Sequence, residues 1–139
     1  GILCFYGDDQ IDSSLLDADI VVLLLPDTPL TQNILNQHTL NLLKRGAFVL
    51  NPGRGPLIDD DALLAALETG QIEHATLDVF RIEPLPKNHQ YWSNNKVTVI
   101  PHKASETRPK TASQVIAMNI ERAENGQELL YLVDRENGY

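Results

Sequence analysis

The sequence has few of the residues on which several classes of protein depend. Among its 139 residues only Cys4 is a cysteine, which excludes an intramolecular disulfide and a cysteine-cluster metal site and favours a reducing cytoplasm. No apolar run is long enough to span a bilayer, and no signal peptide opens the chain. Positive charge is also scarce. The net charge of −8 makes nucleic acid and anionic membrane surfaces poor partners.

The remaining composition is that of an ordinary globular domain. Apolar residues make up 42% of the chain and charged residues 22%, which allows a buried core and does not indicate disorder. The chain begins at Gly1 without a methionine and runs at once into a strand-like segment, residues 2–6. We therefore expect it to be a fragment of a longer protein.

Apolar segments alternate with helical patterns along the chain. Strands are predicted at residues 20–25, 47–50, 75–80 and 97–100. Helices are predicted from a cap at residues 12–14, from Asn36 to Gly46, from Asp59 to Gly70, and after a cap at Thr107. This alternation requires crossover connections, so it predicts an α/β fold with a parallel sheet. Because residues 20–25 are apolar without alternation, we expect that strand to be covered on both faces.

The last predicted helix carries a mostly apolar stripe that must pack on something. Its members recur at helical spacing: Ala112, Val115, Ile116, Asn119, Ile120 and Ala123. This stripe supports an alternative to any enzymatic function, namely a non-catalytic domain that self-associates or binds a partner through the helix.

Polar side chains follow three of the predicted strands. Arg54 stands between two glycines after strand 47–50, Asp78 and then Glu83 come at the end of strand 75–80, and His102 follows strand 97–100. Ligands bind where the carboxyl ends of parallel strands meet, so we expect these side chains at one rim. An arginine can grip a carboxylate bidentately, and a histidine beside a carboxylate can exchange a proton near neutral pH. The set predicts a site that binds a small acid and moves a proton.

Each residue also has a structural explanation when it is taken singly. Arg54 and Glu83 fit solvated loop residues, and Asp78 fits the cap of a strand end. A histidine after a proline, as at His102, is commonly structural. Trp92 fits either the wall of an active site or a packed loop aromatic.

The other histidines predict no metal site. His38, His74 and His89 have no spacing that would assemble metal ligands, so we interpret them as surface residues.

The sequence resembles the D-isomer-specific 2-hydroxyacid dehydrogenases over residues 15–126. The matching segments are Asn51-Pro52-Gly53-Arg54-Gly55-Pro56-Leu57-Ile58-Asp59, Asp61-Ala62-Leu63-Leu64-Ala65-Ala66-Leu67, Leu77-Asp78-Val79-Phe80, Glu83-Pro84 and Pro101-His102. Within this family the chain is most similar to the glyoxylate/hydroxypyruvate reductases. That similarity is carried by Trp92, Thr107-Arg108-Pro109, Val133-Asp134-Arg135 and Gly138-Tyr139.

The resemblance implies a partial Rossmann-type fold. The expected structure is a doubly wound parallel sheet that lacks the first βαβ unit and its glycine-rich phosphate loop. Residues 1–105 would be the latter part of the nucleotide-binding domain. Residues 106–139 would be a C-terminal helix and tail that pack on a substrate domain outside these residues.

The resemblance also implies catalytic roles. His102 would be the acid/base that exchanges a proton with the C2 oxygen of the substrate, and Glu83 would hold its ring and favour the imidazolium. Arg54 would bind the substrate carboxylate and polarise the carbonyl. Lys103 and Glu106 depart from the family by placing charges where apolar or small residues are usual beside the histidine.

A nicotinamide dinucleotide, NAD or NADP, is the implied cofactor, and no metal is implied. The backbone around Leu25, Pro26, Asn51 and Pro52 would line it, and Asp78 would lie near the nicotinamide amide. The full enzyme would reduce a small 2-oxo acid, glyoxylate or hydroxypyruvate, to the D-2-hydroxy acid, as a homodimer. Without the phosphate loop, we expect these 139 residues alone to be inactive.

Overall fold

The computed structural model describes residues 1–136 and divides the chain into two compact units, Gly1–Lys103 and Ala104–Tyr139. The predicted domain boundary, between residues 105 and 106, falls close to this division. The roles predicted for the two parts stay predictions. Gly138 and Tyr139, which contributed to the narrower resemblance, lie outside the described residues.

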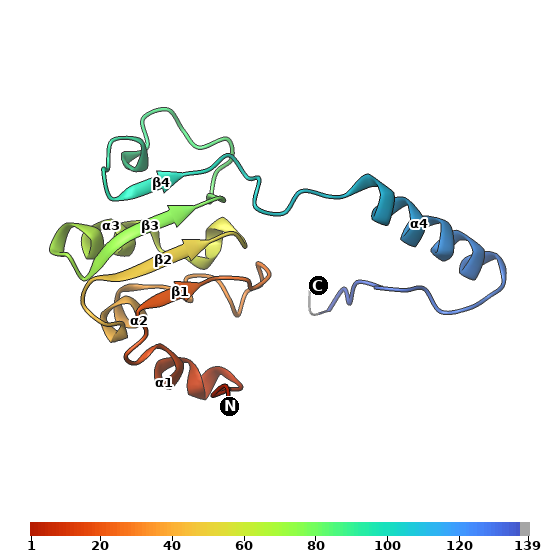
Figure 1. The fold of residues 1–139 in the computed structure, drawn as a ribbon, viewed down its shortest axis with the longest axis horizontal. Helices are drawn as coiled ribbons and strands as arrows, with labels where there is room; N and C mark the ends of the chain where they lie inside the picture. Colours follow the sequence, from red (N-terminus) through yellow and green to blue (C-terminus); the bar gives the residue numbers. More distant parts are fainter. Residues whose placement is uncertain (137–139) are drawn as a thin grey trace. The chain divides into compact units, whose positions relative to one another are not determined.

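A four-stranded parallel sheet organises the first unit. Its strands are β1 (Ile20–Val22), β2 (Ala47–Asn51), β3 (Ile72–Leu77) and β4 (Val97–Val99), and they pair in chain order. All four arrows point the same way in Figure 1, so every carboxyl end reaches the same edge of the sheet. The predicted α/β class with a parallel sheet is confirmed.

Short helices precede the first strand and lie between the later ones. The α-helices of this unit are α1 (Ile11–Leu15), α2 (Gln37–Leu42) and α3 (Asp60–Thr69), and the 3-10 helices are η1 (Asp8–Gln10), η2 (Gly55–Leu57) and η3 (Gln90–Trp92). The predicted starts of α2 and α3 are confirmed, because the side chains of Asn36 and Asp59 accept hydrogen bonds from the first-turn amides. Gly70 ends α3 in the left-handed conformation, with φ 72°.

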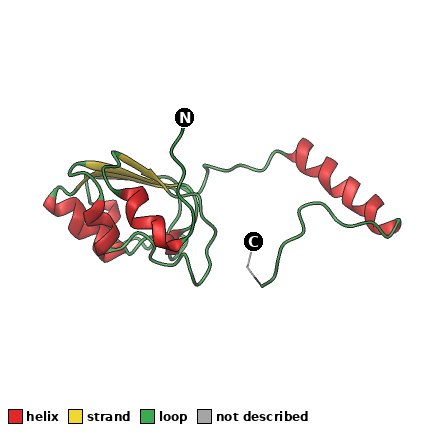
Figure 2. Ribbon diagram, turned by 90° about the horizontal axis from the view of Figure 1, so that it is seen from below, coloured by secondary structure: helices red, strands yellow, loops and turns green. Residues whose placement is uncertain are grey.

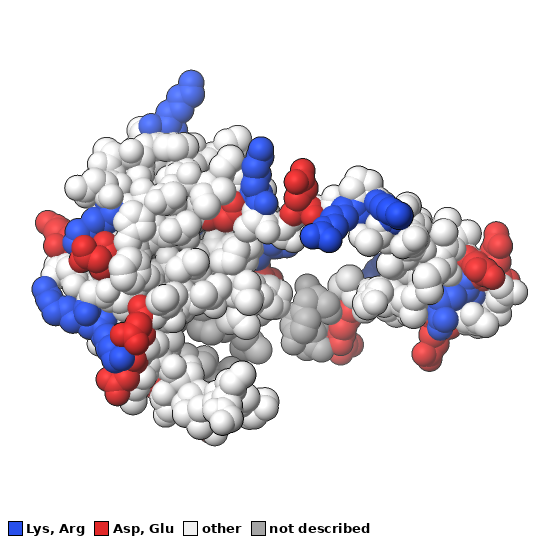
Figure 3. Space-filling model, in the orientation of Figure 1, with Lys and Arg blue, Asp and Glu red and all other residues white. Residues whose placement is uncertain are grey.

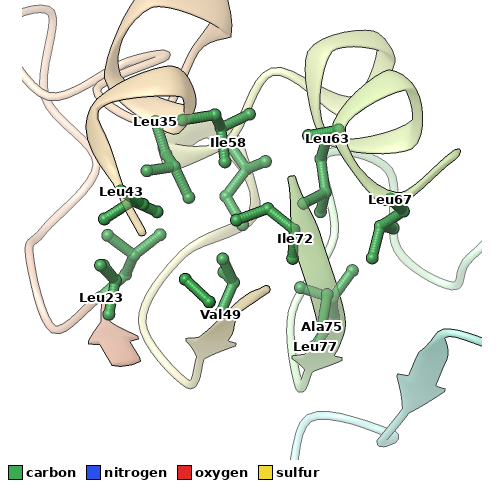
Figure 4. Packing of buried hydrophobic residues seen from close by; sticks show 14 of the residues in the cluster. Leu23, Leu35, Leu43, Val49, Ile58, Leu63, Leu67, Ile72, Ala75 and Leu77 are labelled. Atoms are coloured by element: carbon green, nitrogen blue, oxygen red, sulfur yellow. The ribbon is translucent and has the colours of Figure 1, made fainter. Parts of the chain in front are cut away.

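The hydrophobic core fills the space between the helices and one face of the sheet. Val49, Ala75 and Leu77 point from the strands toward side chains of the helices and connecting segments (Figure 4). Leu63 and Leu67 of α3 are fully buried there, and Leu40 of α2 is also buried. Packing of this kind fixes β2 and β3, the strands whose ends carry Arg54 and Asp78.

The opposite face of the sheet is open, contrary to the prediction for residues 20–25. Helices α1 to α3 all lie on one side of the sheet (Figure 2). Of the predicted strand only Ile20–Val22 is regular, and Ile20 is 59% exposed. Most atoms over the strands on the open face are uncharged (Figure 3). An unbroken apolar run does not reveal which layers cover it, and in the described residues helices cover one face alone.

Several predicted boundaries were also wrong, including the end of α2, which lies at Leu42 and not at Gly46. α1 begins at Ile11, after the turn of η1, so Asp12 lies inside the helix and does not cap it. β3 begins at Ile72 and ends at Leu77, which places Asp78 directly after the strand. The long helix of the second unit is capped by Arg108 with no side-chain hydrogen bond, and Pro109 occupies its first turn in place of the predicted Thr107 cap.

The second unit consists of α4 (Pro109–Glu124) and the segment that follows it. Asn119 holds this segment to the helix, because its side chain donates to Leu130 O at 3.0 Å and accepts from Leu130 N at 2.7 Å. No side chain of α4 is buried, and Ile116 and Ile120 of the predicted stripe are 60% and 56% exposed.

Among residues 1–136, no helix combines the length and the apolar character that a membrane crossing requires.

Candidate active site

The loop after β2 presents Arg54 at the carboxyl edge of the sheet. Asn51, the last residue of the strand, is 1% exposed and shapes the turn through its side chain. Its Nδ2 donates to Arg54 O at 2.9 Å, and its Oδ1 accepts from Gly53 N at 3.1 Å. The guanidinium of Arg54 is exposed, and its one hydrogen bond within residues 1–136 runs to Gly53 O at 2.7 Å. Its remaining donors are therefore available to an anion.

Gly55 brings this loop into contact with the loop after β3. A Cβ placed on Gly55 would lie 2.0 Å from the carbonyl carbon of Phe80 and 2.4 Å from Arg81 N. Only glycine permits this approach. The segment that carries Arg54 is thus packed against the segment that leads to Glu83.

Glu83 and His102 form a hydrogen-bonded pair at the same edge. Oε2 of Glu83 lies 2.8 Å from Nδ1 of His102, and Oε1 accepts from Phe80 N at 2.9 Å. An ionised carboxylate can only accept, so Nδ1 is the nitrogen that donates. Within the described residues Nε2 of His102 has no hydrogen-bond partner, and the side chain is 51% exposed. The free nitrogen can therefore face a ligand.

The surroundings of Glu83 favour its ionised form. Partial burial raises the pKa of its carboxyl, but the hydrogen bonds from His102 and Phe80 and the positive charges of His102 and Arg54 lower it. The combined effect holds the pKa of Glu83 below its ordinary value. Arg54, on the loop that contacts Phe80 at Gly55, is one of the charges that favour the ionised carboxylate.

Asp78 supports the backbone that carries His102. The Asp78 carboxylate is buried directly after β3, and its Oδ1 accepts from Lys103 N at 2.7 Å. His102 itself has a left-handed backbone with φ 51°, a conformation that is uncommon for a non-glycine residue. Sparsely populated backbone conformations persist where the surrounding structure fixes them, and they concentrate at functional sites.

A cavity of about 390 Å³ adjoins the Glu83–His102 pair. Apart from these two residues its walls are apolar, and they include Phe80, Leu85 and Trp92. The indole Nε1 of Trp92 donates to Pro86 O at 2.9 Å, which fixes the ring at the cavity wall. The cavity has room for a small molecule.

The residues predicted to line the dinucleotide meet at the junction of the loops after β1 and β2. A Cβ on Gly53 would lie 2.8 Å from Leu23 O and 3.3 Å from Leu25 O, so the segment after β1 contacts the loop after β2 at this glycine. Leu25 is 39% exposed and Pro52 is half-buried, and both fit the apolar surroundings of a nicotinamide ring. In the described chain no helix starts between β1 and Asn36, so this junction offers no helix N-terminus to a pyrophosphate.

The structure places the predicted catalytic residues at one edge, as their positions after parallel strands indicated. Two supporting contacts were not predicted: the backbone N–H of Phe80 on Glu83, and the approach of Gly55 to Phe80. The neighbouring glycines and prolines signalled a loop but gave no indication of its partner. In residues 1–136 no three His, Cys, Asp or Glu side chains gather in a way that could hold a metal ion.

The sequence model of the D-isomer specific 2-hydroxyacid dehydrogenase, NAD binding domain, matches residues 5–104. The match confirms the predicted family and the predicted cofactor class, a nicotinamide dinucleotide.

Solved structures agree with this match. A D-isomer specific 2-hydroxyacid dehydrogenase from Xanthobacter autotrophicus Py2, crystallised with NADPH and MES, is 45% identical with a TM-score of 0.94. The match covers 98% of this chain and 56% of that one. An NADPH-dependent glyoxylate/hydroxypyruvate reductase from Sinorhizobium meliloti, in complex with NADP and sulfate, is 32% identical with a TM-score of 0.91. Here the match covers 96% of this chain and 44% of that one.

A third structure, from Klebsiella pneumoniae 342, is described as a D-isomer specific 2-hydroxyacid dehydrogenase family protein. It is 38% identical with a TM-score of 0.88, over 96% of this chain and 43% of that one. The chain thus spans about half the length of the solved structures that it matches. On the family match and these identities, the chain belongs to the D-isomer specific 2-hydroxyacid dehydrogenases.

Proposed function

We propose that the protein containing this chain reduces a small 2-oxo acid, glyoxylate or hydroxypyruvate, to the D-2-hydroxy acid with NADH or NADPH. The observation that carries the proposal is the His102–Glu83 pair, 2.8 Å long, with Nε2 of His102 unpartnered in the described residues and Arg54 at the same edge of the sheet. The named activity of the Sinorhizobium meliloti reductase supports the choice of substrate.

Arg54 binds and orients the substrate in this proposal. Its exposed guanidinium presents donors in the planar arrangement that matches a carboxylate. Because the loop is fixed by Asn51 and Gly55, little conformational freedom is lost when the anion binds. The positive charge also lies where it can stabilise negative charge as it develops on the C2 oxygen.

His102 transfers the proton. The ionised Glu83 accepts from Nδ1 and holds the ring, so that Nε2 of the imidazolium donates a proton to the C2 oxygen during reduction. A nicotinamide dinucleotide supplies the hydride when it is bound. In the reverse direction Nε2 takes the hydroxyl proton. The apolar cavity beside the pair can take the uncharged part of a small substrate.

The test is a pair of substitutions in the natively expressed protein, with whatever sequence adjoins these residues. Arg54→Ala and His102→Gln are each expected to reduce kcat/KM for glyoxylate by at least about 10³-fold, since each removes a group that contacts the reacting substrate.

The matched control is His38→Gln. His38 also pairs with a carboxylate at 2.8 Å, that of Asp12, but it lies on α2 and outside the proposed site. Its activity should equal that of the wild type. Full activity in either Arg54→Ala or His102→Gln would refute the proposal.

The same variants test the non-catalytic alternative, which stays a prediction. If the chain acts by self-association through α4, replacing Arg54 or His102 leaves that association unchanged and no reductase activity is lost. The homodimer, the cytoplasmic location and the inactivity of the 139 residues alone are likewise our proposals. Gel filtration of the native protein and an NADPH assay of the isolated chain test the first and the last.

A further inference from the structure

We propose that Arg81 is a positioning residue that fixes the loop of Arg54 relative to Glu83 and thereby sets the geometry of substrate binding. This inference rests on the proposed function. Arg81 lies in the loop after β3, and its side chain donates to Asn33, Pro56 and Ile58, none of which is a proposed catalytic residue. Its contribution runs through the backbone that presents Arg54.

The Arg81 side chain closes over the end of η2, the turn that follows Arg54 directly. Its Nε donates to Ile58 O at 2.9 Å, and its Nη2 donates to Pro56 O at 3.2 Å. Nη2 also donates to Ile58 O and to the side chain of Asn33. One guanidinium therefore holds together carbonyl groups from the turn and a side chain from the loop before α2. Hydrogen bonds from a charged donor of this kind are among the stronger ones in proteins.

A carboxylate keeps the guanidinium in place. Oδ2 of Asp60 lies 4.0 Å from Nε of Arg81, and Oδ1 of the same residue accepts from the hydroxyl of Tyr91 at 2.9 Å. His89 adds a third neighbour, with its Nε2 3.8 Å from the carboxylate. The Arg81 and Asp60 side chains are 33% and 26% exposed, so much of the pair is shielded from solvent. Because the Arg81 side chain is partly buried and has several polar partners, it samples fewer conformations than an exposed arginine.

The backbone of Arg81 contacts the other end of the same turn. Its amide nitrogen would lie 2.4 Å from a Cβ on Gly55, so only a glycine fits at that position. Arg81 thus contacts the turn at Gly55 through its backbone and at Ile58 through its side chain. Arg81 also stands two residues before Glu83 in the chain. It therefore links the segment that carries the substrate-binding cation to the segment that carries the partner of His102.

The first test is a double-mutant cycle in the natively expressed protein. Arg81→Met keeps the length of the side chain but removes every donor, and kcat/KM for glyoxylate is expected to fall about tenfold to 10²-fold, as small misplacements of binding groups do. The fall should come mainly from a higher KM, while the dissociation constant of NADPH changes less than about twofold.

Combined with Arg54→Ala, the same substitution should cause no further loss, because a residue that acts through Arg54 has nothing left to position. Arg81→Lys should restore part of the activity, since a lysine reaches one carbonyl.

The control is Arg45→Met, because Arg45 also donates from Nη2 to a backbone carbonyl, that of Thr69, at 2.6 Å. Arg45 lies away from the loop of Arg54, so this variant should keep wild-type kinetics.

Amide hydrogen exchange in the 139-residue chain tests the positioning without any activity. The amides of Leu57 and Ile58 donate to Arg54 O and Gly55 O within the turn. Their exchange should rise about tenfold or more in Arg81→Met and stay unchanged in Arg45→Met, with β3 unaffected in both.

The outcomes separate the inference from the proposed function. If Arg54→Ala is inactive but Arg81→Met matches the wild type, or adds its full loss to that of Arg54→Ala, the inference is wrong and the proposed function stands. If the turn amides exchange no faster in Arg81→Met, the inference is also wrong. If the wild type reduces no 2-oxo acid and Arg54→Ala changes nothing, the proposed function fails and the inference fails with it.

Discussion

Two histidine–carboxylate contacts in the described chain have the same length but lie in different surroundings. His102 lies 2.8 Å from Glu83, and His38 lies 2.8 Å from Asp12. Asp12 belongs to α1 and His38 to α2, and their side chains are 56% and 66% exposed. The values for Glu83 and His102 are 36% and 51%. Distance alone therefore does not identify the functional pair.

The difference lies in the additional partners of the carboxylate. Glu83 also accepts from Phe80 N, is influenced by the charge of Arg54 and lines an apolar cavity with His102. The contact of His38 with Asp12 connects a pair of short helices, where an exposed ion pair contributes little to stability. The comparison indicates that a histidine becomes a candidate acid/base through the groups that orient and charge its partner.

The largest loss of stability is expected from Gly55→Ala. This substitution disturbs the loop that holds Glu83 and leaves the His38–Asp12 contact intact. The new Cβ would overlap the Phe80 carbonyl carbon at 2.0 Å, and Phe80 carries the N–H that holds Glu83. Because the neighbour is backbone, relief requires moving a whole loop, and we expect a loss of more than about 4 kcal/mol in the free energy of unfolding.

Urea unfolding measures this loss. The control is Gly46→Ala, where nothing lies within 4 Å of the added Cβ and the cost of a left-handed backbone at φ 82° is about 1 kcal/mol. Equal losses in the two variants would show that the approach of Gly55 to Phe80 is not tight.

A smaller effect is expected when each carboxylate is replaced by its amide. Glu83→Gln offers one acceptor oxygen in place of two and no charge to the imidazolium, so kcat/KM should fall about 10²-fold in the natively expressed protein. Asp12→Asn should leave it unchanged. Steady-state assays with glyoxylate and with hydroxypyruvate measure both variants. If Glu83→Gln and Asp12→Asn had equal activity, the Glu83–His102 pair would have no more functional importance than the Asp12–His38 pair.

The smallest effect is expected from pH. The pKa of Glu83 is lower in the folded chain than its ordinary value, so its contribution to stability is fully present above the unfolded value of about 4.3. That contribution is lost as the pH falls through the folded pKa. Since the pair is partly exposed, the contribution should be below about 1 kcal/mol.

Urea midpoints at pH 6 and pH 3 measure this dependence in the wild type, Glu83→Gln and His102→Gln. The difference in urea midpoint between the wild type and Glu83→Gln should be smaller at pH 3 than at pH 6. A gap of constant size would mean that the ionisation of Glu83 is not coupled to folding.

The sequence allowed the fold and the position of the site to be predicted because both follow from short-range patterns. Apolar segments and turn residues located each strand, and a parallel sheet necessarily brings Arg54, Asp78 and His102 to one edge. The starts of α2 and α3, at Asn36 and Asp59, were also predicted. These features depend on residues within a few positions of one another.

The features that could not be predicted depend on contacts between distant segments. Arg81 donates to carbonyls of a different loop, and backbone carbonyls carry no sequence signal. The run Ile20–Leu25 gave the composition of a strand but not the number of layers around it. His102 has a left-handed backbone that no neighbouring residue requires. Each of these is decided by tertiary packing.

The order of the strands in the sheet is also their order in the chain, β1, β2, β3 and β4. Within β1 to β4, every strand after the first thus pairs with one that was synthesised before it. Among these four strands, none inserts between two strands that precede it in the chain. Domains fold from the N-terminal side during synthesis, and this sheet can grow in step with translation, one strand and its covering helix at a time. The edge that carries Arg54 would then be built before His102 is translated.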